Sequence, residues 1–129
     1  MNKFSQNSIN NREGVNRKLI AISDMALNLS IIDFGIPQLG GLRTTDQQRI
    51  LYFAGKSKCD GVTSPSKHQS GNALDVYAYV DGKASWEEHH LTLVAAAMLQ
   101  AASHMGYKLS WGGLWTSFQD MPHFQLEVE

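Results

Sequence analysis

Two histidines and one aspartate have the residue types and the setting of a metal site. His68 lies in the segment SPSKHQSGNALDVYAY (residues 64–79), seven residues before Asp75, and His123 lies near the other end of the sequence. Asp75 interrupts an apolar, strand-like run, and an ionised carboxylate is costly to bury unless it is paired, hydrogen-bonded or bound to a metal. Two imidazoles and one carboxylate form a three-ligand set that leaves the fourth position of a zinc ion open for water.

The spacing of these three residues leaves two other interpretations open. A buried histidine that is satisfied by a carboxylate is commoner than a metal site. The same side chains also match the facial triad of a non-haem iron oxygenase. In that class the first histidine and the carboxylate are usually about two residues apart, whereas His68 and Asp75 are seven apart. Zinc is therefore favoured over iron.

The other three histidines and the cysteine are not expected to take part in this site. His89 and His90 are neighbours on a predicted helix, so their side chains should point about 100° apart and should not share one ion. The string EEHH also lacks the i, i+4 histidine pair of a zincin helix. His104 has no acidic or histidine partner at helical spacing. Cys59 is the only cysteine, which excludes an internal disulfide and a thiolate-rich metal cage.

Length and composition predict one continuous globular domain over residues 1–129. The chain is 43% hydrophobic and 18% charged, which is ordinary for a folded protein. A net charge of −1 gives no reason to expect nucleic acid or an anionic membrane as a partner. No stretch reaches the roughly 20 apolar residues of a membrane helix, and the N-terminus lacks the apolar core of a signal peptide. We therefore expect a soluble chain, made in a cytoplasm and not inserted into a membrane.

The elements that must position the candidate residues follow from apolar periodicity and from glycine and proline positions. A long loop over residues 56–72 carries His68, and loops of this length in small domains are usually functional. Helices and hairpin-linked strands in this order predict an α+β fold, with a small antiparallel sheet and flanking helices. The expected helices cover residues 11–29, 46–54 and 86–105, and the expected strands cover residues 31–36, 73–80, 107–111 and 123–128.

Two motifs resemble those of a known enzyme family. SKHQSGNALD resembles the S-x-H-x-x-G-x-A-x-D motif of the M15 zinc peptidases, which are D-alanyl-D-alanine carboxypeptidase-like. DMPHF resembles their second motif, in which an acidic residue precedes the last histidine ligand. GLRTTDQQ, LYFAGKSK and WGGLW follow the order expected for that family. The resemblance extends over about residues 4–126, is strongest to phage endolysins that act as L-alanyl-D-glutamate peptidases, and implies a hedgehog/DD-peptidase-like fold.

The resemblance implies a role for five residues. His68, Asp75 and His123 match the ligands of one zinc ion per chain. Asp120 matches the catalytic acid/base, a place at which many relatives have glutamate. Arg43 matches an arginine that contacts the substrate carbonyl, and its permanent charge suits an oxyanion or a substrate carboxylate. A surface salt bridge is the alternative role for Arg43.

The resemblance also implies a function. It indicates a zinc-dependent peptidase that hydrolyses an amide bond in the peptide stem of bacterial peptidoglycan, with L-alanyl-D-glutamate endopeptidase favoured. The alternatives are a D-alanyl-D-alanine carboxypeptidase and a non-catalytic, zinc-containing module that binds the cell wall. The expected protein is a monomeric endolysin that is made in the host cytoplasm and reaches the wall after the membrane is permeabilised.

Five further residues are expected near the site. Ser66 is expected to hydrogen-bond behind the ligands and orient them. Trp111 and Trp115 belong to WGGLW and are expected either to line a groove for the peptide or to pack at its rim or in the core. Tyr77 and Tyr79 should share the face of the aspartate on their strand, because side chains alternate along a strand.

Overall fold

The structure is a computed structural model that describes residues 2–127 of the 129-residue chain. It confirms the predicted α+β fold, with two small antiparallel sheets in the described residues where one was expected. The helices are α1 (Gln6–Asn11), α2 (Arg17–Leu29), α3 (Thr45–Phe53) and α4 (Glu88–Met105), with a short 3-10 helix, η1 (Gly112–Leu114). One sheet has the order β1 (Asp33–Gly35), β3 (Tyr77–Val80), β4 (Lys83–Ser85), and the other has the order β2 (Ala73–Asp75), β6 (His123–Leu126), β5 (Leu109–Trp111).

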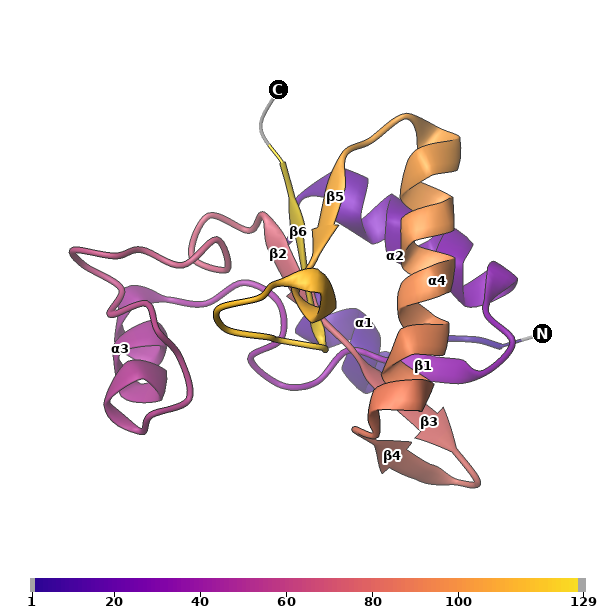
Figure 1. The fold of residues 1–129 in the computed structure, drawn as a ribbon, viewed down its shortest axis with the longest axis horizontal. Coiled ribbons are helices and arrows are strands. Elements are labelled where there is room, and N and C mark those ends of the chain that lie inside the picture. Colours follow the sequence, from indigo (N-terminus) through magenta and orange to yellow (C-terminus); the bar gives the residue numbers. More distant parts are fainter. Residues whose placement is uncertain (1, 128–129) are drawn as a thin grey trace.

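Helices α2 and α4 pack against each other and supply much of the core (Figure 1). The predicted apolar stripe of α4 is confirmed, because all five of its members are buried: Leu91, Val94, Ala95, Met98 and Ala102. The alanines on this face leave room for α2 to come close. The helix ends at Gly106, whose positive φ of 79° closes the last turn as expected of a glycine at that place.

The first predicted helix is wrong at its start. Asn16 lies outside the helix and its side chain accepts a hydrogen bond from the backbone N–H of Lys18, so α2 begins at Arg17. The short helix α1 precedes it and is capped by Ser5. Only Ser8 is buried on α1, so this helix has no apolar stripe that periodicity could detect.

The predicted strand over residues 73–80 is wrong in its continuity. β2 ends at Asp75 and β3 begins at Tyr77, and the two strands belong to different sheets. Val76 between them is fully buried, and its N–H donates to the carbonyl of Pro122. Both pieces are apolar because both enter the core, which hides the break from a sequence pattern. The last predicted strand is present as β6, and Val128 lies outside the described residues.

Helix α3 lies apart from the α2 and α4 pair, at the left of Figure 1. It is capped by Thr44 in a reciprocal capping box with Gln47, so the helix begins at Thr45, one residue before the expected start. The chain after α3 forms the long loop that leads to β2 and carries His68. Fully buried Gln48 holds this loop to the helix, because its amide nitrogen donates to Ser57 Oγ and to the carbonyl of Cys59, at 2.8 and 2.9 Å. No helix within residues 2–127 is long and apolar enough to cross a membrane.

Candidate metal centre and active site

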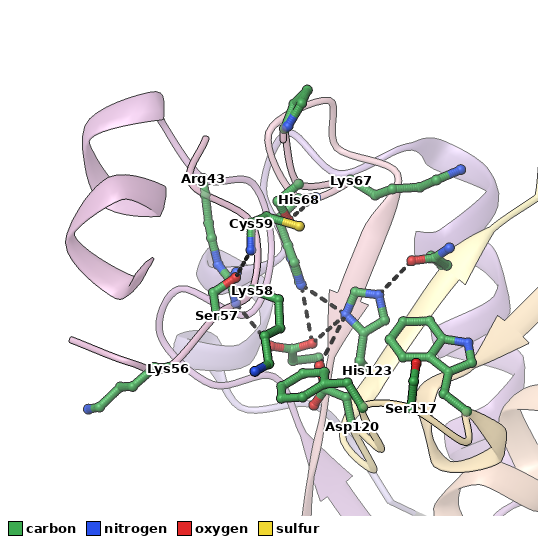
Figure 2. Close-up of a pocket in the computed structure, with 16 residues that line it drawn as sticks. Arg43, Lys56, Ser57, Lys58, Cys59, Lys67, His68, Ser117, Asp120 and His123 are labelled. Atoms are coloured by element: carbon green, nitrogen blue, oxygen red, sulfur yellow. Dashed lines mark hydrogen bonds and ion pairs between the residues drawn. The ribbon is translucent and has the colours of Figure 1, made fainter. Parts of the chain in front are cut away.

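The three predicted metal ligands lie together. His68 Nε2, Asp75 Oδ1 and His123 Nδ1 form a triangle in which each pair of atoms is 3.2 Å apart (Figure 2). Zinc bonds of about 2.0–2.2 Å in tetrahedral geometry place neighbouring ligand atoms roughly 3.3–3.6 Å apart. The observed triangle is within a few tenths of an ångström of one face of such a tetrahedron, so the donor set fits a zinc ion.

The hydrogen bonds behind the two imidazoles leave lone pairs facing one another. His68 Nδ1 lies 2.9 Å from the carbonyl oxygen of Gly41, so this nitrogen must donate. His123 Nε2 lies 2.9 Å from Gln125 Oε1, and the Gln125 amide nitrogen donates to Glu127. Each neutral ring therefore uses its proton on the outer side. While both rings are neutral, two imidazole lone pairs and a carboxylate oxygen converge without a donor between them, and either a metal ion or an added proton must fill that place.

The charges at the site favour a cation between these donors. Burial by itself raises the pKa of Asp75. The His68 and His123 imidazoles together lower this pKa by more than burial raises it, so it lies well below its usual range. Burial lowers the pKa of His123, but the hydrogen bond and the charge of Asp75 outweigh this effect and raise it. A carboxylate that stays ionised beside two imidazoles attracts positive charge, and a divalent ion supplies that charge without a proton.

Strand pairing and a tight turn bring the ligands together. β2 and β6 are antiparallel, and their register places Asp75 opposite His123, so the two side chains share one face of the sheet. The His68 backbone is held in a turn, where its N–H donates to Ser66 Oγ at 3.2 Å and its carbonyl accepts from Gly71 at 3.3 Å. Ser66 thus holds the backbone of a candidate ligand and not its ring.

Arg43 contacts the other oxygen of the candidate carboxylate ligand. Its Nη2 is 3.1 Å from Asp75 Oδ2, its Nε donates to the carbonyl of Leu39 at 2.7 Å, and its Nη1 donates to Gln48 Oε1 at 3.0 Å. The side chain is only 11% exposed, so Arg43 does form a salt bridge, but a largely buried one and not the surface salt bridge of the alternative. The guanidinium fixes Oδ2 of Asp75 and leaves Oδ1 directed at the imidazoles.

Replacement of Arg43 by lysine should leave the fold intact and slow turnover about tenfold or more. An ammonium cannot reach Leu39, Gln48 and Asp75 at once, because it lacks the planar fork of a guanidinium. Asp75 would then be less firmly oriented. Wall-lysis rate and melting temperature measure the effect, with Arg49→Lys on the exposed face of α3 as the matched control. Unchanged kinetics of Arg43→Lys would contradict this role.

Asp120 lies beside the triangle and outside it. Its Oδ2 is 4.0 Å from His123 Nδ1, and the carboxylate is half-buried. The backbone fixes its place, because Asp120 N–H donates to the carbonyl of Gly112 and its own carbonyl accepts from His123 N–H. A Cβ at Gly112 would lie 2.2 Å from the Asp120 carbonyl oxygen, so this approach requires glycine. Burial and the charge of Asp75 raise the pKa of Asp120, which brings it closer to the range of a proton acceptor at neutral pH.

The triangle opens onto a cavity of about 560 Å³. Trp115 lines it with its ring centroid 5.2 Å from that of His123, whereas Trp111 stacks on Phe124 in the core. Of the two tryptophans, then, only Trp115 is placed to meet a peptide. Tyr77 and Tyr79 are not among the residues around this cavity, since the break after β2 turns them away, and the expectation that they border it is wrong.

Gln125, Lys58 and Phe118 are among the lining residues that were not assigned to the site from the sequence. Gln125 could have been found, because it lies two places after His123 on a strand and so shares its face. Lys58 and Phe118 lie in irregular loops on opposite walls of the cavity, and no periodic pattern marks them.

A second group of possible ligands lies at the start of α4. One ligand atom each from Glu87, His89 and His90 lies within 4.8 Å of the others. His89 and His90 were expected not to share one ion, and this expectation is wrong as far as the distance between their ligand atoms is concerned. Glu87 and His89 are exposed, however, and His90 Nδ1 already shares a hydrogen bond with Ser85 Oγ at 2.6 Å. His104, as expected, is an exposed residue near the end of the same helix.

Comparisons with known proteins identify relatives of this chain. A family model described as phage L-alanyl-D-glutamate peptidase matches residues 1–126. The L-alanyl-D-glutamate peptidase of Escherichia phage T5 is 34% identical over 119 residues, which are 92% of this chain and 85% of that protein. The crystal structure of Serratia marcescens L-Ala D-Glu endopeptidase ChiX has a TM-score of 0.85 and 35% identity, over 97% of this chain and 90% of that one.

A more distant structure shows how far the fold extends. The L,D-carboxypeptidase DacB from Streptococcus pneumoniae has a TM-score of 0.50 and 20% identity, over 91% of this chain and 68% of that one. At this identity the likeness bears on the fold alone. The match over residues 1–126, together with relatives at 34% and 35% identity over most of their length, identifies the family. The chain belongs to the phage L-alanyl-D-glutamate peptidases.

Proposed function

We propose that the chain is a zinc-dependent endopeptidase that cleaves the L-alanyl-D-glutamate bond in the peptide stem of bacterial peptidoglycan. The observation that carries the proposal is the 3.2 Å triangle of His68 Nε2, Asp75 Oδ1 and His123 Nδ1 at the cavity. These three atoms would be the protein ligands of one zinc ion. The choice of bond is supported by the two relatives that carry this activity in their names. As an endolysin, the protein would act on the wall once the membrane is permeabilised.

The side chains around the triangle have different roles in amide hydrolysis. Zinc held there acts as a Lewis acid and lowers the pKa of water to about 7. Asp120 takes a proton from the attacking water and delivers it to the nitrogen of the leaving glutamate, while the water oxygen joins the alanine carbonyl carbon. A well-placed group of this kind contributes roughly a hundred- to ten-thousand-fold. Trp115 shields one side of His123 from solvent.

Arg43 has donors left for the substrate. A guanidinium carries five N–H groups, and the bonds to Leu39, Gln48 and Asp75 use three of them. Because Arg43 also lines the cavity, a remaining N–H can donate to the substrate carbonyl as negative charge develops on its oxygen. Arg43 thus orients Asp75 and contacts the reacting group.

Digestion of purified peptidoglycan tests the proposal directly. Mass spectrometry should find new N-terminal D-glutamate ends, and these should disappear when the enzyme is treated with a chelator. Released D-alanine would identify a carboxypeptidase instead. A digest without new ends, from protein that still sediments with the wall, would identify a binding module.

A further inference from the structure

The cavity carries more positive than negative charge. It is lined by four basic and two acidic side chains, which are Arg43, Lys56, Lys58, Lys67, Asp75 and Asp120. Arg43 is paired with Asp75, which leaves three lysines and a single carboxylate among the lining residues. A cleft with such an excess of one sign raises the local concentration of ligands of the other sign. The charge therefore favours a substrate with a negative group near the scissile bond.

Lys58 is the lysine of the cavity that contacts an aromatic side chain of the lining. In Figure 2 Lys56 and Lys67 extend away from the centre of the cavity. The Lys58 ammonium lies 5.4 Å from the centroid of the Phe118 ring, so the contact joins the two walls of the cavity. Within residues 2–127, Lys58 makes no ion pair with a carboxylate.

The backbone on both sides of Lys58 is held in place. Buried Gln48 donates to Ser57 Oγ and to the carbonyl of Cys59, and the Cys59 N–H donates to the same Ser57 oxygen at 3.2 Å. The flanking residues are therefore tied to α3, and the chain gives up little freedom when the ammonium meets a ligand. Lys58 is exposed, and its charge is not paired with a carboxylate of the chain, so a fixed backbone presents a free ammonium to a ligand in the cavity.

The chemistry of the substrate supplies a matching anion. Glutamate has two carboxyl groups, and a peptide continues through only one of them. The residue on the leaving side of an L-alanyl-D-glutamate bond therefore keeps a free carboxylate within a few bonds of the scissile nitrogen. From the place of Lys58, we infer that its ammonium binds this carboxylate and makes the enzyme prefer a free glutamate over its carboxamide form. The inference rests on the proposed function and assigns a specificity determinant to the same site.

Two synthetic stem peptides test the inference. They differ only in whether the free carboxyl of the leaving glutamate is a carboxylate or a carboxamide. The wild-type enzyme should cut the carboxylate peptide with the higher kcat/KM. Lys58→Met should lower kcat/KM for that peptide about ten- to hundredfold, mainly through KM, because one charged hydrogen bond is lost. The same variant should cut the carboxamide peptide like the wild type, and Lys58→Arg should keep most of the preference.

Lys83→Met is the matched control, because it removes the same charge from an exposed residue of β4 that does not line the cavity. Its preference ratio should equal that of the wild type. A Lys58→Met enzyme with an unchanged ratio, or with equal losses on both peptides at a normal melting temperature, would overturn the inference. A wild-type enzyme that cuts neither peptide at this bond would overturn the proposed function instead.

Discussion

Asp120→Asn is expected to hold zinc normally, melt at a near-normal temperature and lose about a hundredfold or more of its rate. Asparagine keeps the size of the side chain, and the backbone bonds of residue 120 to Gly112 and His123 are unaffected. The amide cannot take up and release a proton at neutral pH. Because Asp120 lies outside the triangle of His68, Asp75 and His123, the ion should remain in place. Zinc content, melting temperature and wall-lysis rate on one preparation give the answer.

The opposite pattern would assign Asp120 a structural role. If the carboxylate only stabilised the turn before Pro122, the variant would be less stable and would keep most of its activity. Asp46→Asn is the control, since it removes a carboxylate from the first turn of α3, outside the cavity. A fully active Asp120→Asn enzyme would mean that another group moves the proton.

His68→Ala and His123→Ala should each lose both the zinc ion and all measurable activity. Each substitution removes one of three donors, and two remaining ligands cannot hold a catalytic zinc ion against water. Elemental analysis of wild-type protein purified without added metal should find about one equivalent of zinc. The variants should contain little, and their rates should be those of the uncatalysed background.

His104→Ala provides the comparison for a general effect of removing an imidazole. His104 is exposed on α4, away from the cavity, so its variant should keep both zinc and activity. Wild-type protein that stays fully active after exhaustive chelation would refute the metal-dependent mechanism. So would a His68→Ala variant that binds zinc as tightly as the wild type.

The candidate site could be chosen from the sequence because its chemistry is local. His68 and Asp75 lie in one short motif, and Asp120 and His123 lie in another. The helix pattern of α4 was also local, since burial every three or four residues identifies it. The two motifs meet because β2 pairs with β6 in one particular register. This pairing joins distant segments of the chain, so no periodic pattern in the sequence predicts it. The meeting itself was therefore predicted from a resemblance and not from the pattern.

Other features of the structure could not be predicted from the sequence, for physical reasons. The break at Val76 is hidden because both flanking strands place apolar residues in the core, Leu74 from β2 and Ala78 from β3. The partner of Arg43 depends on the fold of the loop between Leu39 and the start of α3, which no propensity fixes. Lys58 reads as an ordinary surface lysine until Gln48 is seen to hold the residues on both sides of it.

Because β2 pairs with β6, an ion bound at the site would stabilise the fold. Asp75 and His123 are 48 residues apart in the chain, and an ion held by both ties the two strands as a cross-link would. Because the ion binds the folded chain and not the unfolded one, its binding energy adds to the free energy of unfolding. Opening of β6 then requires release of the ion, so backbone amides in β6 should exchange with deuterium more slowly in the metal-loaded protein. Helix α3 supplies no ligand, so its amides should exchange at the same rate with and without the metal.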